Sequence, residues 1–223
     1  MLLHSFIVKL GTAVIVVCFF ISIFFSKKVK PYYYRYIFTF ILIGVLLSVN
    51  TIASDNYAWR YGMKFRILIE QILILSQFIL LSLFFLQVLK KSKFLIKIKL
   101  LLILSTIIQV GLIIVVHTTN TEIRPTTLPN LILLIFCSFY LIDIMNNKPA
   151  VKILEASTFW LVMGILFSAC IGFPVSSLIP FISKTSNYSN VRFQIFSIYN
   201  MSLIIMYLFI IKSYTCLKHP QGL

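Results

Sequence analysis

The stretch of sequence that decides the fold covers residues 66–99 and reads RILIEQILILSQFILLSLFFLQVLKKSKFLIKIK. Residues 66–88 form one apolar block, and about 20 such residues are enough for a helix to cross the hydrocarbon core of a bilayer. The block ends in a dense basic run, Lys90, Lys91, Lys93, Lys97 and Lys99. Cytoplasmic loops of membrane proteins carry such an excess of positive charge. This stretch therefore predicts a transmembrane helix that ends at a cytoplasmic membrane surface.

Similar apolar blocks recur along the whole chain. They predict about seven spans, at residues 5–25, 33–53, 66–88, 95–117, 130–146, 157–179 and 193–212. The composition agrees, because 60% of the residues are hydrophobic and 11% are charged, against about 45–50% and about 25% in soluble domains. The predicted fold class is an all-α, polytopic transmembrane helix bundle. We expect residues 1–223 to form one domain of seven spans, without a soluble domain.

Two spans have uncertain limits. The fifth is short, and an earlier start at Thr127 is an alternative. The sixth contains Pro174 and Pro180. Proline has no backbone N–H to donate, so we expect these two residues to kink or end that helix.

The basic residues are divided unequally between alternate connections. Of the 20 lysines and arginines, 13 fall on one side of the predicted membrane and 7 on the other. The more basic side is cytoplasmic by the positive-inside rule. The N-terminus is therefore predicted outside and the C-terminus inside.

Several functional classes are disfavoured by the sequence. The net charge of +15 does not indicate a nucleic-acid binder, because the charges lie in short runs between apolar blocks. The four cysteines, Cys18, Cys137, Cys170 and Cys216, have the spacing of neither a disulfide framework nor a metal site. The sequence shows no hydrolase, zinc-protease or phosphate-loop motif. We accordingly predict no catalytic residues, no metal and no cofactor.

Polar side chains inside the apolar blocks are the candidate site. An ionisable residue within a span indicates function by default, and Glu70 is such a residue. Gln77, seven positions later, shares its helix face. The candidate ligand-binding residues are Glu70, Gln77, Asn50, Gln109, Gln194 and Asn200. By depth they predict an outward-facing polar cavity lined by the second, third, fourth and seventh spans. The alternative is a set of interhelical hydrogen bonds, worth about 0.6 kcal/mol each.

Two further groups have simpler interpretations. Gly164, Ser168, Ala169 and Gly172 give the sixth span small residues, which favour close helix packing. Asp143 lies near the inner end of the fifth span, where a headgroup-level salt bridge is expected. It is too far from Glu70, about 20 Å by helical rise, to share a reaction centre with it.

Short sequences in three spans carry a resemblance. They are Ile69-Glu70-Gln71, Phe159-Trp160 followed by Gly164-Ile165-Leu166, and Ser197-Ile198-Tyr199-Asn200. In these the chain resembles an uncharacterised family of small seven-helix membrane proteins common in Bacteroidetes. The resemblance implies a bacterial cytoplasmic (inner) membrane and a sensory or accessory role, and it carries no catalytic residues. It departs from the family at Asn130, where an acidic residue is common.

The residues leave three functions open. The first is a non-enzymatic receptor or accessory subunit, which would act through a protein partner bound to the cytoplasmic basic loops. The alternatives are a small-molecule or ion transporter or channel, and a membrane-embedded lipid-modifying enzyme. Membrane lipids are expected partners in each case, whereas the oligomeric state is not predicted.

Overall fold

The computed structural model describes residues 2–26, 32–61, 63–119, 127–147, 150–182 and 188–216. Within these ranges the chain is helical. The helices are α1 (Leu2–Ser26), α2 (Tyr33–Tyr61), α3 (Met63–Val88), α4 (Leu95–Thr119), α5 (Thr127–Asn147), α6 (Ala150–Glu155), α7 (Ser157–Ile182) and α8 (Tyr188–Cys216). No β-strand occurs in the described ranges.

Seven of the described helices are long and apolar enough to cross a membrane. A helix satisfies its own backbone hydrogen bonds, which hydrocarbon cannot do for an extended chain. The structure thus confirms the predicted all-α, multi-pass helix bundle. The short α6 was not predicted.

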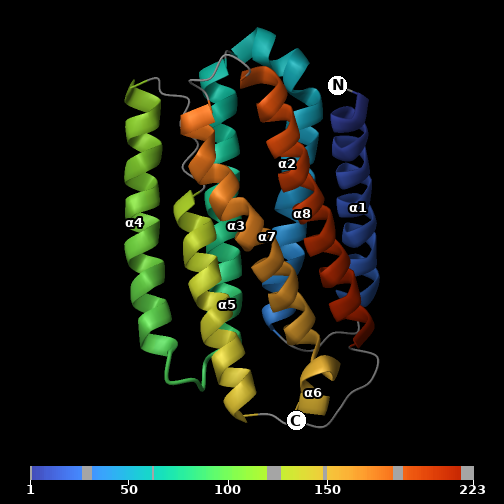
Figure 1. Cartoon of the computed structure of the whole chain (residues 1–223), viewed down its shortest axis with the longest axis vertical. Helices are drawn as coiled ribbons and strands as arrows, with labels where there is room; N and C mark the ends of the chain where they lie inside the picture. Colours follow the sequence, from blue (N-terminus) through green and yellow to red (C-terminus); the bar gives the residue numbers. More distant parts are fainter. Residues whose placement is uncertain are drawn as a thin grey trace.

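The long helices form a ring with one helix outside it. Around the ring α1 packs on α2, α2 on α3, α3 on α5, α5 on α7, α7 on α8 and α8 on α1. The most extensive pairing is that of α7 with α8. Helix α4 packs against α3 and α5, and it stands at the opposite edge of the bundle from α1 (Figure 1).

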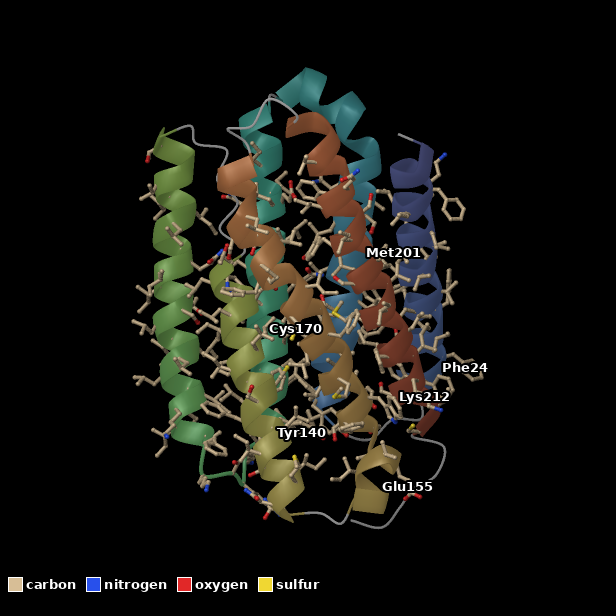
Figure 2. All side chains as sticks on the ribbon, in the orientation of Figure 1. Phe24, Tyr140, Glu155, Cys170, Met201 and Lys212 are labelled. Carbon is tan, nitrogen blue, oxygen red and sulfur yellow. The ribbon has the colours of Figure 1, made fainter. Side chains whose placement is uncertain are left out.

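The two ends of the bundle can be told apart in Figure 1. The lower end carries the α3–α4 turn and α6, and the upper end carries the start of α1. Lys212 and Glu155 lie toward the lower end (Figure 2). In the sequence, the connections at this lower end are the more basic set.

Aromatic side chains fill the interior of the lower half of the bundle. Phe85 of α3 contacts Phe136 of α5, with ring centroids 5.8 Å apart. Phe94, just before α4, stacks on Phe139 of α5 at 4.7 Å. The outer surface is apolar in turn, because side chains such as Ile107 and Phe24 are mostly exposed. Phe24 points away from the bundle (Figure 2). This apolar surface contacts lipid.

The predicted packing role of the small residues is confirmed for two glycines. A Cβ added at Gly164 would lie 2.8 Å from the Phe209 Cβ and 3.0 Å from the Met206 carbonyl oxygen. This close approach joins α7 to α8. At Gly172 the added Cβ would lie 2.8 Å from the Asn130 amide nitrogen, so α5 approaches α7 there.

Two helix limits differ from the sequence-based expectation. Helix α7 continues past Pro174 and Pro180 to Ile182, so these prolines do not end the helix, and the kink that was the other expected outcome stays a prediction. Nearby, the hydroxyls of Ser176 and Ser177 donate to the Phe173 carbonyl at 3.0 and 2.9 Å, and such side-chain bonds help membrane helices to tolerate proline.

Helix α5 begins at Thr127, which was the alternative start, and not at residue 130. Pro129 is compatible with this start, since the first four N–H groups of a helix have no helical partner.

Candidate functional site

A polar cluster joins α2, α3 and α8 in the middle of the bundle. The Gln77 side-chain amide of α3 donates to the Phe40 carbonyl of α2 at 3.4 Å. A Cβ added at Gly44 of α2 would collide with the Tyr207 hydroxyl of α8 and lie 3.5 Å from the Gln77 amide nitrogen. Glycine at position 44 thus lets polar groups from two other helices come close to α2. We call Phe40, Gly44, Gln77 and Tyr207 the seam cluster.

Three of the predicted site residues share a level about two helical turns above the seam cluster. Glu70 lies seven residues before Gln77, and Asn200 lies seven residues before Tyr207. A separation of seven returns to nearly the same face of a helix, about 10 Å along its axis. On α2, which runs the other way, that level is reached between Leu47 and Asn50.

The side chains of Glu70, Asn50 and Asn200 are partly buried at this level. Their helices are those of the seam cluster. An amide from each of α2 and α8 and a carboxyl group from α3 can offer hydrogen-bond donors and acceptors to a ligand. We call these three residues the outer layer.

The structure places the other two predicted residues elsewhere. Gln109 lies on α4, whose main packing partners are α3 and α5, and it is only 2% exposed. Gln194 is exposed near the upper end of α8. The six predicted residues therefore do not form one group: Gln77 belongs to the seam cluster, three residues belong to the outer layer, and Gln109 lies on another side of α3.

Gln71 is a buried polar residue that the sequence analysis did not select. Its side chain is 6% exposed, and its amide nitrogen has no hydrogen-bond partner. It shares a face of α3 with Phe78 and Phe85, at spacings of seven and fourteen residues. Its burial could not be predicted from sequence, because hydropathy does not show which way a residue on a span faces.

A group of hydroxyl-bearing side chains lies at the lower end of the bundle. The Tyr140 hydroxyl of α5 bonds the Thr158 hydroxyl of α7 at 2.9 Å. The hydroxyl of the buried Tyr34 has Ser157 and Ser213 as its polar neighbours, although none is at hydrogen-bond geometry. The tyrosine run at residues 32–36 indicates headgroup contact, but Tyr34 instead packs inward on Tyr214, with ring centroids 5.0 Å apart.

In the described part of the chain, the remaining candidate residues are not brought together into a reactive or metal-binding site. All four cysteines are free, and Cys18 and Cys137 are fully buried. Within the described ranges no three His, Cys, Asp or Glu residues are grouped as a metal site would require. The side chains of His117, Lys148 and Lys152 lie outside the described residues, so the salt bridge predicted for Asp143 stays a prediction.

Comparison with known proteins adds no assignment. No family model, no curated protein and no solved structure matches this chain.

Proposed function

We propose that this multi-pass membrane protein is a non-enzymatic receptor or accessory subunit. A small or lipidic ligand binds at the outer layer, and a partner protein reads the bound state at the basic lower end. The supporting observation is the set of three partly buried polar residues, Glu70, Asn50 and Asn200, on the three helices that the seam cluster joins.

The seam cluster connects this proposed ligand site to the rest of the bundle. Tyr207 stacks on Phe40 with ring centroids 6.1 Å apart, and its hydroxyl lies against Gly44. A ligand that draws the upper parts of α3 and α8 together changes the packing of these rings. Because side chains in a packed core move in discrete steps, such a change can reach the lower end.

The lower end supplies a surface for the proposed partner. Arg35, Lys90, Lys93 and Lys212 are exposed there. Arg35 lies 4.5 Å from the Tyr32 ring centroid and Lys212 lies 5.8 Å from that of Trp160. Arranged cations of this kind attract an acidic partner surface. This part of the proposal places the lower end in the cytoplasm of a bacterial cell, beside the inner membrane.

The test uses Glu70→Gln, which keeps the shape of the side chain and replaces its carboxyl group by an amide. Tagged wild type and variant are purified from native membranes in mild detergent, and the small molecules, lipids and proteins that come with them are identified by mass spectrometry. We expect the wild type to carry a stoichiometric partner and a bound molecule, and the variant to lose the bound molecule while remaining folded.

The matched control is Glu155→Gln, which removes an exposed carboxylate on α6. It should change neither the recovery of the partner protein nor that of the bound molecule. Equal recovery of the same molecule with Glu70→Gln would place the ligand elsewhere. Flux of a solute through liposomes that contain only this protein would instead establish a transporter.

A further inference from the structure

Helix α4 turns one apolar face away from the rest of the bundle. Its main packing partners are α3 and α5, and it stands at the edge of the bundle (Figure 1). Ile98 marks the inner side of the helix, because its side chain is fully buried. The opposite side carries four exposed apolar residues at spacings of four, three and four, which is one helix face: Ile96, Leu100, Ile103 and Ile107. We call these four residues the outer strip.

Two exposed lysines, Lys97 and Lys99, flank the lower end of the outer strip. The span of α4 starts at Leu95, so both lysines lie in its first two turns. Each is the sequence neighbour of Ile98, and one residue turns a helix by about 100°. The two side chains therefore leave α4 on opposite sides of the buried Ile98. A lysine lays its stem along apolar surface and keeps its ammonium group in the polar zone, so both ammonium groups can reach the membrane surface.

The positive charge at the lower end of α4 exceeds the negative charge around it. The turn that precedes α4 adds Lys90, Lys91 and Lys93, which are exposed as well. Helix α3, this turn and α4 together contain one acidic residue, Glu70, near the other end of α3. Helix α5 contributes one carboxylate at the lower end, Asp143. A cluster of about four to eight basic residues beside a span attracts anionic lipid headgroups.

The outer strip suits an acyl chain better than a helix of another protein. Its ends, Ile96 and Ile107, are about 17 Å apart along the helix axis, and half of the hydrocarbon core of a bilayer is about 15 Å thick. Helices that associate within membranes meet through small residues or through polar side chains. The four residues of the outer strip are isoleucine and leucine, so they offer a partner helix neither of these contacts.

We propose that the lower end of α4 binds an anionic phospholipid, whose phosphate contacts Lys97 and Lys99 and whose acyl chain lies along the outer strip. The lysine ammonium groups donate hydrogen bonds to the phosphate oxygens. A zwitterionic headgroup brings its own ammonium group and gains less from two lysines. Helix α4 contributes to neither the seam cluster nor the outer layer, so a failure of this proposal or of the proposed function leaves the other standing.

The test compares the wild type with the double variant Lys97→Gln/Lys99→Gln. Detergent-purified protein is titrated with dioleoyl phosphatidylglycerol and, separately, with dioleoyl phosphatidylcholine, which has the same chains and a zwitterionic headgroup. Native mass spectrometry measures the lipid that stays bound. We expect the wild type to bind phosphatidylglycerol at least about tenfold more tightly than phosphatidylcholine, and the double variant to lose this preference.

The matched control is Lys9→Gln/Lys91→Gln, which removes the same charge from exposed lysines outside α4 and should keep the preference. An equal loss in this control would show a response to net charge alone and overturn the proposal. Equal affinity for soluble glycerol phosphate, which has no acyl chain, would overturn it too, because the outer strip would then play no part. A dimer that excludes the lipid in the same spectra would identify the outer strip as a contact between two copies and would also overturn the proposal.

Discussion

At the scale of single residues, three glycines show how closely the helices approach. Around Gly164 the nearest atoms are backbone and a Cβ of α8, which cannot move without moving the helix. Around Gly172 the nearest atoms belong to the Asn130 amide, which can rotate away. At Gly111 of α4 an added Cβ would meet nothing within 4 Å. The same substitution should therefore have three different effects.

We expect Gly164→Ala to lower the free energy of unfolding by about 1–3 kcal/mol, because overpacking separates α7 from α8. Gly172→Ala should cost less, since only a side chain has to adjust. Gly111→Ala should be neutral or stabilise by about 0.5–1 kcal/mol, as glycine weakens a helix relative to alanine. Melting temperatures of the three purified variants give the order, and an equal loss at Gly111 and Gly164 would contradict it.

The residue scale is also where prediction from sequence is weakest. The heptad relation between Glu70 and Gln77 was visible in the sequence, and so was the depth of Asn50 and Asn200. Which helix each residue would face was not, because the order of helices around a ring is not encoded in hydropathy. Gln109 illustrates this: its depth was predictable, but its place on the α4 side of α3 required the structure.

At the scale of elements, one side-chain hydrogen bond ties α6 to α7. The Trp160 indole N–H of α7 donates to the Leu154 carbonyl of α6 at 2.8 Å. The same ring stacks on Phe209 of α8, with centroids 5.8 Å apart. One aromatic side chain thus links a short helix to the most extensive helix pair of the fold.

Trp160→Phe keeps an aromatic ring and removes the donor. We expect a loss of about 1 kcal/mol in stability and faster hydrogen exchange of the amides in residues 150–155. Trp160→Leu, which also removes the stacking, should cost more. Hydrogen–deuterium exchange with mass spectrometry measures both, and an unchanged exchange rate in α6 would show that other contacts hold it.

The helices themselves were largely predictable from sequence. Spans of about 20 apolar residues are unambiguous in a chain with so few charges. Errors occurred where local chemistry competes with hydropathy. The fifth span was predicted from residue 130 with Thr127 as the alternative start, and the helix begins at Thr127 because its first turn tolerates Pro129. Pro174 was expected to kink or end the sixth span, and α7 continues past it.

At the scale of the whole molecule, the orientation in the membrane remains the main prediction. The positive-inside rule places the lower end, with the last turn of α8, in the cytoplasm. Cys216 is the final residue of α8 and is partly exposed, while Cys18 and Cys137 are fully buried. Cys170 is exposed halfway along α7 (Figure 2), where it faces lipid and not water.

We therefore expect a membrane-impermeant maleimide to leave intact cells unlabelled and to label inside-out vesicles at Cys216. A membrane-impermeant reagent does not enter the hydrocarbon core, so it does not reach Cys170. Cys216→Ser should abolish the signal. Labelling of intact cells at Cys216 would mean that the chain has the opposite orientation.

The ring closes between α1 and α8, and this has a consequence for biosynthesis. Gly11 of α1 lies against Ile204 of α8, because a Cβ added at Gly11 would lie 3.7 Å from the Ile204 Cγ1 atom. While the ribosome is still making the intervening helices, α2 is the main packing partner of α1. We expect its second face to stay in contact with lipid or an insertion factor until α8 has been made. The packing of α1 is therefore completed only after α8 has been made, and a chain arrested before α8 should be degraded as an unassembled fragment.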